Sequence, residues 1–221
     1  MSHRASRRRR VLVSLAGVGV LSAAGLSLLP SMASAAPCSD VEVVFARGTG
    51  EAPGLGITGT PLVKDIKSAL PGRTVASYAV DYAANFAQTS AGPGATDMTE
   101  EVESTAANCP RTSFVLGGYS QGGSVTDIAL GIRTQLGTGR TIPQGLAARV
   151  KAVVVFGNPL RLSGRTIASA SDLFGPKAKE FCNTGDPVCG NGRNGAAHLT
   201  YHLNGSVDDG ARFAAERIAR G

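Results

Sequence analysis

A serine set between glycines, in the stretch Gly118-Tyr119-Ser120-Gln121-Gly122, is the first candidate for chemistry in this chain. An apolar run precedes it and a helix-compatible segment follows it, which is the context of a nucleophile elbow, although short glycine patterns also occur in ordinary turns. The serine of such an elbow adopts an unfavourable backbone conformation, and a Cβ close to it would clash. The turn would hold the Ser120 hydroxyl above a sheet edge, with the N–H of Gln121 aimed at a developing oxyanion.

A serine hydroxyl becomes a useful nucleophile when a histidine takes its proton and a carboxylate orients that histidine. After the first 36 residues the histidines are His198 and His202. Their i, i+4 spacing would also suit a shared metal, but no glutamate of an H-E-x-x-H pattern lies between them. His198 follows two alanines in a predicted loop that would let it reach the elbow. We therefore expect His198 to be the base and His202 to lie at the surface or at the start of a helix.

The orienting carboxylate is expected between the serine and the histidine, where the candidates are Asp127, Asp172, Glu180 and Asp186. Asp127 would point away from the elbow, two turns into the following helix, and Asp172 and Glu180 fall in a polar stretch that we expect to be solvated. Asp186 lies in the stretch CNTGDPVC, where a disulfide would restrict the loop and help to hold an imidazole in one tautomer. Gly-Asp-Pro is also common turn chemistry, and the two roles are compatible.

Four short runs rich in β-branched or aromatic residues are predicted strands, at residues 41–46, 74–80, 113–116 and 152–156. Helices are predicted at residues 61–70, 96–107, 125–136 and 208–219. The glycine- and proline-rich stretches 48–59 and 91–94 are predicted loops. Strands that alternate with helices favour one domain with a mostly parallel sheet covered on both faces.

The first 35 residues have the features of a signal peptide: a run of arginines, an apolar stretch over residues 11–30 and an Ala33-Ser34-Ala35 cleavage site. The arginine run also fits a twin-arginine signal, so the signal is of the Sec or the twin-arginine type. An uncleaved membrane anchor is the alternative, because the apolar run is close to the roughly 20 residues that a bilayer needs. We expect cleavage near Ala35 and secretion of a domain formed by residues 36–221. This leader holds five arginines and no acid, so the rest of the chain is nearly neutral and nothing in it indicates a nucleic-acid partner.

The chain has four cysteines, at positions 38, 109, 182 and 189. An even number in an exported protein predicts two disulfides, and the sequence allows three connectivities. Cys182 and Cys189 are close enough to close a small loop, which would leave Cys38 to pair with Cys109. A zinc site is the alternative, but the chain has no C-x-x-C pair and its histidines lie elsewhere.

Four stretches in this order, VVFARGTGE, GYSQGG, CNTGDPVC and AHLTYH, resemble the cutinase family of small secreted serine esterases. The resemblance covers essentially the whole chain after the leader. It implies a single-domain α/β-hydrolase fold without a lid domain, and catalysis without a cofactor or metal. It further implies a triad of Ser120, Asp186 and His198, an oxyanion hole from Thr49 and Gln121, and the disulfides Cys38–Cys109 and Cys182–Cys189.

The expected activity is hydrolysis of carboxylic esters through an acyl-enzyme, on short acyl esters or a cutin-type polyester. The alternatives are an acetylxylan-type deacetylase or an acyltransferase with the same triad, and a binding protein that has lost catalysis. Family members generally flank the site with apolar residues, for which Phe86, Val188 and Leu199 are candidates, although each would equally suit a core. Residues 190–197 are polar and glycine-rich instead. We therefore expect a monomer that contacts lipid or polymer surfaces at most transiently and prefers short, soluble esters.

Overall fold

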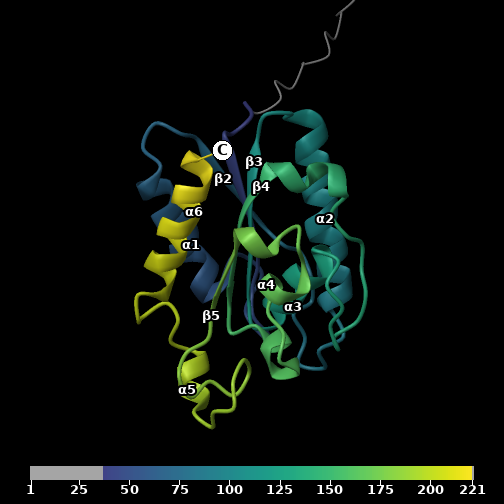
Figure 1. Cartoon of the computed structure of the whole chain (residues 1–221), viewed down its shortest axis with the longest axis vertical. Coiled ribbons are helices and arrows are strands. Elements are labelled where there is room, and N and C mark those ends of the chain that lie inside the picture. Colours follow the sequence, from purple (N-terminus) through teal and green to yellow (C-terminus); the bar gives the residue numbers. More distant parts are fainter. Residues whose placement is uncertain (1–36, 221) are drawn as a thin grey trace, which may run out of the picture. The chain divides into compact units, whose positions relative to one another are not determined.

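A five-stranded sheet lies at the centre of the computed structural model, which describes residues 37–220 (Figure 1). Its strands are β1 (Val41–Ala46), β2 (Val75–Ala79), β3 (Ser113–Tyr119), β4 (Val150–Phe156) and β5 (Ala178–Phe181). Their order in the sheet is β2-β1-β3-β4-β5, and all four neighbouring pairs are parallel. The predicted signal peptide and the anchor alternative lie outside the described residues.

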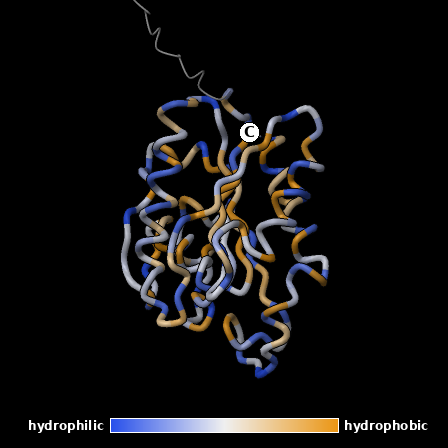
Figure 2. Tube along the Cα trace, turned by 180° about the vertical axis from the view of Figure 1, so that it is seen from behind, coloured by the Kyte–Doolittle hydropathy of each residue, from blue (hydrophilic) through white to orange (hydrophobic). Residues whose placement is uncertain are grey.

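Alternating side chains of the strands enter two hydrophobic cores, one on each face of the sheet. In β1, Val41, Val43 and Phe45 contribute to one core, while Val44 and Ala46 contribute to the other. This period of two is what a strand produces when both of its faces are covered. Figure 2 shows the resulting concentration of hydrophobic segments along the central strands.

Two helices cover each face of the sheet. Helices α1 (Gly56–Ala69) and α6 (Ser206–Ala219) lie side by side on one face, and α2 (Ala91–Asn108) and α3 (Gln121–Ala129) on the other (Figure 1). The shorter elements are α4 (Ile167–Ala170), α5 (Gly195–His198) and the 3-10 turns η1 (Gln144–Arg149), η2 (Pro159–Ser163) and η3 (Gly175–Lys177). No helix within residues 37–220 is long and apolar enough to cross a membrane.

The predicted mostly parallel sheet with helices on both faces is confirmed, but several predicted boundaries are wrong. Helix α2 begins at Ala91, inside the predicted loop 91–94. Its glycines serve close packing instead of a turn, because a Cβ at Gly92 would collide with the backbone of Thr138. Helix α1 begins at Gly56, so Pro61 lies inside the helix and not at its start. Helix α3 begins at the elbow itself and ends at Ala129, seven residues before the predicted end.

The order of the strands changes direction between β1 and β3. The chain leaves β1 toward β2 on one side of the sheet, whereas β3 pairs with β1 on the other side. Ligands of open parallel sheets bind at such a switch in strand order. The loop with Thr49 follows β1 and Ser120 follows β3, so both predicted site segments lie at this switch in strand order.

Candidate active site

Ser120 occupies the strained turn that the glycine pattern predicts. Its φ is 57° and its ψ is −119°, a conformation that costs a non-glycine residue free energy. A Cβ at Gly118 would clash with the carbonyl of Gly122, and one at Gly122 would clash with the carbonyl of Ala46. The Ser120 N–H donates to the carbonyl of Phe156 at 2.9 Å, which ties the turn to the end of β4. The two glycines are therefore required for the elbow to form.

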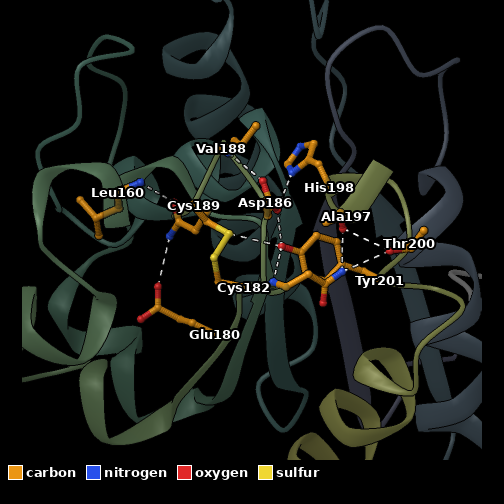
Figure 3. Close-up of a disulfide and its surroundings, with 12 residues drawn as sticks. Leu160, Glu180, Cys182, Asp186, Val188, Cys189, Ala197, His198, Thr200 and Tyr201 are labelled. Carbon is orange, nitrogen blue, oxygen red and sulfur yellow. Dashed lines mark hydrogen bonds and ion pairs between the residues drawn. A yellow bond between two sulfur atoms is a disulfide. The ribbon is translucent and has the colours of Figure 1, made fainter. Parts of the chain in front are cut away.

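Asp186 and His198 form a hydrogen-bonded pair beside this elbow. The distance from His198 Nδ1 to Asp186 Oδ2 is 2.8 Å (Figure 3). The imidazole stacks on the ring of Tyr119, the residue before Ser120, with ring centroids 5.0 Å apart. The Tyr119 hydroxyl donates to the His198 carbonyl at 2.9 Å. These contacts fix the ring against the residue that precedes Ser120, and Nδ1 is bonded to the carboxylate.

Asp186 is fully buried in the loop that follows β5. The disulfide Cys182–Cys189 closes this loop, and Cys38–Cys109 is the second disulfide, so the predicted pairing is confirmed and no cysteine remains for zinc. The Asn183 amide group donates to the Ala197 carbonyl at 2.7 Å, and the Asn194 N–H donates to the Gly185 carbonyl at 2.9 Å. The carboxylate and the imidazole are thus held by two segments that are bonded to each other.

Three hydrogen bonds reach the Asp186 carboxylate. The Val188 N–H donates to Oδ1 at 2.7 Å, and His198 and the Tyr201 hydroxyl both approach Oδ2, the latter at 2.5 Å. Burial by itself would raise the pKa of Asp186, but the hydrogen bonds from Tyr201, His198 and Val188 together lower it below its ordinary value. The group is therefore an anion at neutral pH, as an orienting carboxylate must be.

The loop after β1 is held by a glutamate that sequence reasoning did not single out. Glu51 accepts the N–H of Gly48 at 2.5 Å and that of Ile57, in the first turn of α1, at 2.7 Å. The N–H of Gly50 donates to Ala84 at 2.8 Å. Within residues 37–220 the backbone N–H groups of Thr49 and Gln121 have no acceptor, whereas those of Gly48, Gly50 and Glu51 in the loop after β1 are bonded. Free donors are what an oxyanion hole needs.

A side-chain network joins the two segments that carry these free N–H groups. Gln88 donates to the Thr49 hydroxyl at 2.9 Å and accepts from the side-chain amide of Gln121 at 3.0 Å. Gln121 also donates to the Asn85 carbonyl at 3.2 Å. Gln88 itself has a φ of 59°, so its loop is held in an unfavourable conformation that this network supports.

The rejected candidates are found away from the pair. Asp127 is fully buried in α3 and accepts a hydrogen bond from Asn158 at 3.1 Å, so it points away from the elbow as expected. Glu180 is half-buried in β5 and accepts from the Ile167 N–H at 2.9 Å, so the expectation of a solvated side chain was wrong for this residue. Asp172 and His202 are exposed. His198 is the last residue of the short helix α5 and does not lie in an open loop.

The candidate wall residues differ in their exposure. Phe86 is 84% exposed and Leu199 is 57% exposed, so neither is a core residue, and Val188 is half-buried. The Phe86 ring lies against Gly50, where a Cβ would be 2.6 Å from Cζ. Leu199 directly follows His198. Apolar side chains therefore lie beside both the Thr49 loop and the histidine.

Comparison with known proteins shows the family. The cutinase family matches residues 37–218. A cutinase of Kineococcus radiotolerans is 63% identical over 183 residues, which are 82% of this chain and 62% of that protein. The chain thus spans less than two thirds of that relative. The phospholipase Culp4 of Mycobacterium tuberculosis is 39% identical over 217 residues, 97% of this chain and 93% of Culp4.

Solved structures with a similar fold include two esterases. A Trichoderma reesei cutinase with a phosphonate inhibitor has a TM-score of 0.66 and 29% identity, and the match covers 82% of this chain and 78% of the other. An acetylxylan esterase has a TM-score of 0.73 and 26% identity, covering 82% of this chain and all of the other. On the match to residues 37–218 and on these relatives, the chain belongs to the cutinase family.

Proposed function

We propose that the chain is a secreted serine esterase that hydrolyses carboxylic esters through an acyl-enzyme. The observation that carries the proposal is the 2.8 Å hydrogen bond between Asp186 and His198, with the imidazole stacked beside the strained Ser120 elbow. A nucleophile, a base and an orienting anion in this arrangement support acyl transfer. The names of the relatives, cutinase, carboxylesterase and phospholipase, all describe hydrolysis of esters.

The first half-reaction forms the acyl-serine. Ser120 Oγ attacks the ester carbonyl carbon while its proton passes to Nε2 of His198, and the carbonyl oxygen becomes an oxyanion. The free N–H groups of Thr49 and Gln121 stabilise that oxyanion. The bond to the alcohol oxygen then breaks, and His198 returns the proton to the departing alkoxide. Removal of one oxyanion donor typically raises the barrier by about 2.7–4 kcal/mol.

The second half-reaction consumes water. His198 takes a proton from a water molecule as its oxygen attacks the acyl carbon, and Ser120 leaves with that proton. The products are the carboxylic acid and the free enzyme. Asp186 stays ionised throughout and stabilises the imidazolium that forms in each half.

Fluorophosphonate labelling tests this assignment directly. The wild-type protein should gain one adduct by mass spectrometry and should hydrolyse p-nitrophenyl butyrate, and Ser120→Ala should lose both properties. Ser124→Ala is the matched control, because Ser124 is a buried serine one turn further along α3 and should leave labelling intact. A wild-type protein that stays unlabelled would leave the binding-protein alternative, and labelling of another serine would exclude the proposed nucleophile.

The substrate class is a short acyl ester or a cutin-type polyester. Exposed Phe86 and Leu199 supply apolar contacts beside the site, while residues 190–197 remain polar, which suits a small acyl group better than a long chain. We expect faster turnover of a butyrate ester than of an emulsified long-chain triglyceride, and the reverse order would contradict this preference. An acyltransferase would form a new ester when an alcohol is added.

A second candidate function is deacetylation of a polysaccharide. It is favoured by the structural similarity to an acetylxylan esterase, with a TM-score of 0.73. Release of acetate from acetylated xylan, measured beside p-nitrophenyl butyrate hydrolysis, distinguishes the two activities.

We further propose that the domain of residues 36–221 is exported, cleaved near Ala35 and monomeric. Two disulfides support an oxidising compartment. Amino-terminal sequencing of the exported protein tests the cleavage site, and size-exclusion chromatography tests the oligomeric state.

A further inference from the structure

Tyr201 is a buried tyrosine, three residues after His198, to which the mechanism above assigns no role. It is 1% exposed, and its ring is fixed by edge contacts with three other rings. The centroid distances are 6.0 Å to Tyr119, 5.9 Å to Phe156 and 6.2 Å to His198. A ring held on several sides keeps its hydroxyl in one place.

The hydrogen bonds of this hydroxyl determine where its proton points. The Asn183 N–H donates to Tyr201 Oη at 3.1 Å, so the phenol oxygen accepts there. Cys189 Sγ lies 3.3 Å from Oη, but it is a disulfide sulfur and only a weak acceptor. Asp186 Oδ2 lies at 2.5 Å and carries negative charge, which makes it much the stronger acceptor. The phenol proton is therefore directed at Asp186.

The oxygen that receives this proton is also the oxygen that holds the histidine. Asp186 Oδ2 accepts from both Tyr201 Oη and His198 Nδ1, while Oδ1 accepts from the Val188 amide. Burial and the charge of Asp186 raise the pKa of Tyr201, so the phenol remains a donor at every pH at which an esterase works. The imidazolium and the phenol thus share one anionic atom.

We propose that Tyr201 is a positioning residue of the triad, whose phenol fixes Oδ2 of Asp186 toward His198 and withdraws part of the charge on that atom. This inference rests on the proposed esterase function. Because a less basic carboxylate stabilises the imidazolium less, His198 remains a free base at lower pH than it would beside an unshared carboxylate. Tyr201 thereby sets the acidic limit of the pH range in which Ser120 can be activated.

Other titratable groups near this network keep their contacts when the phenol hydroxyl is removed. Tyr119 stacks on His198 and donates to its backbone carbonyl, and Glu51, whose charge acts on Tyr119, is bonded to backbone amides. Neither group bonds to Tyr201. Tyr201→Phe therefore removes the hydrogen bond to Asp186, together with the one from the Asn183 N–H, and keeps the ring contacts.

The test measures kcat/KM of p-nitrophenyl butyrate against pH for the wild type and Tyr201→Phe. We expect the acidic limb to move to higher pH by about half to one unit, since loss of the donor strengthens the hold of Asp186 on the imidazolium. A one-unit shift lowers kcat/KM about tenfold on the acidic side of the profile. The plateau value of kcat/KM at higher pH should stay within about threefold of the wild-type value. An unmoved limb would overturn the proposal, even if the variant were less stable.

Two tyrosines serve as controls. Tyr78 donates to Asp97 at 3.1 Å on β2, away from the triad, so Tyr78→Phe removes a tyrosine–aspartate hydrogen bond of the same kind and should leave the limb in place. Tyr119→Phe removes a hydroxyl that touches the backbone of His198 and not the carboxylate. It should change the rate without moving the limb, and a shift equal to that of Tyr201→Phe would argue against a specific role of Tyr201.

A titration of the imidazoles by NMR separates this inference from the esterase assignment. The Cε1–H resonance of His198, assigned by its loss in His198→Gln, should titrate at higher pH in Tyr201→Phe whether or not the protein hydrolyses esters. Equal midpoints in the two proteins would overturn the inference while leaving the esterase assignment intact. If Tyr201→Phe does not fold, the wild type still provides a test: a slowly exchanging phenol proton should shift as His198 titrates, and its absence would count against the proposal.

Discussion

Gly157 is the residue at which the end of the sheet meets the imidazole. It follows β4 with a φ of 59°, and its N–H donates to the Phe181 carbonyl at 2.8 Å. A Cβ at this position would lie 2.6 Å from Cε1 and 2.9 Å from Nδ1 of His198. The missing side chain therefore creates the space in which the histidine ring lies.

Gly157→Ala is expected to displace the His198 ring and reduce kcat about a hundredfold, since a shift of about 1 Å at a catalytic group has an effect of that size. Gly164→Ala is the matched control, because Gly164 has a φ of 71° but open space around its would-be Cβ. In both variants alanine in the left-handed region should lower the free energy of unfolding by about 1–2 kcal/mol. Melting temperatures and kcat are compared, and equal kcat values in the two variants would show that the ring contact is unimportant.

At the scale of single residues, the chemistry could be predicted but its supports could not. Ser120 stands out because its flanking glycines lie between a predicted strand and a predicted helix, and the positions of Asp127 and Asp186 in the chain favour Asp186 as the orienting carboxylate. Gly157 and Tyr201 act through contacts with residues about 40 and 15 positions away, and no local pattern marks them. The stretch AHLTYH contained Tyr201, but its geometry was needed to reveal the shared oxygen.

At the scale of elements, the two disulfides close loops of very different length. Cys38 and Cys109 are 71 residues apart and join the segment before β1 to the end of α2, whereas Cys182 and Cys189 are 7 residues apart and enclose Asp186. In the chain-entropy description a longer loop gives a larger stabilisation. The Cys38–Cys109 disulfide should therefore contribute mainly to stability, and the Cys182–Cys189 disulfide mainly to the position of Asp186.

Replacement of each cysteine pair by serine should separate these effects. Loss of Cys38–Cys109 should lower the unfolding free energy by about 4 kcal/mol and leave kcat of the folded protein nearly unchanged. Loss of Cys182–Cys189 should cost about 2.5 kcal/mol and reduce kcat at least tenfold, because the loop that carries Asp186 is released. Urea unfolding followed by circular dichroism gives the unfolding free energy, and hydrolysis of p-nitrophenyl butyrate gives kcat. An unchanged kcat in the second variant would show that backbone contacts alone hold Asp186.

Elements with a clean hydrophobic pattern could be predicted from the sequence, and elements formed by tertiary contacts could not. β1 lies where residues 41–46 were predicted, because all six of its residues are buried. β5 had no predicted counterpart, since its sequence AKEF is half-buried at the sheet edge and half charged. The first turn of α1 is glycine-rich, and it is fixed by Glu51 from outside the helix.

At the scale of the whole molecule, two buried carboxyl groups make the stability depend on pH. Glu42 in β1 and Asp127 in α3 each have one oxygen without a partner within residues 37–220. Burial raises the pKa of Glu42 to about 7 and that of Asp127 to about 8. In the unfolded chain such groups lose their proton near pH 4, so between these values the folded protein binds more protons than the unfolded one.

The unfolding free energy should therefore fall as the pH rises from about 4 to 8, by about 1.4 kcal/mol per pH unit for each proton that separates the two states. Between pH 7 and 8 Glu42 contributes little further change, so Asp127 should dominate that window. Asp127→Asn should flatten the slope there, while Asp172→Asn, at an exposed position, should leave it as in the wild type. Urea unfolding followed by circular dichroism suits a chain without tryptophan. An equal slope in Asp127→Asn and the wild type would mean that Asp127 is already ionised in the folded protein. The elbow helix would then carry a buried charge stabilised by the hydrogen bond from Asn158 and the charge of Arg165.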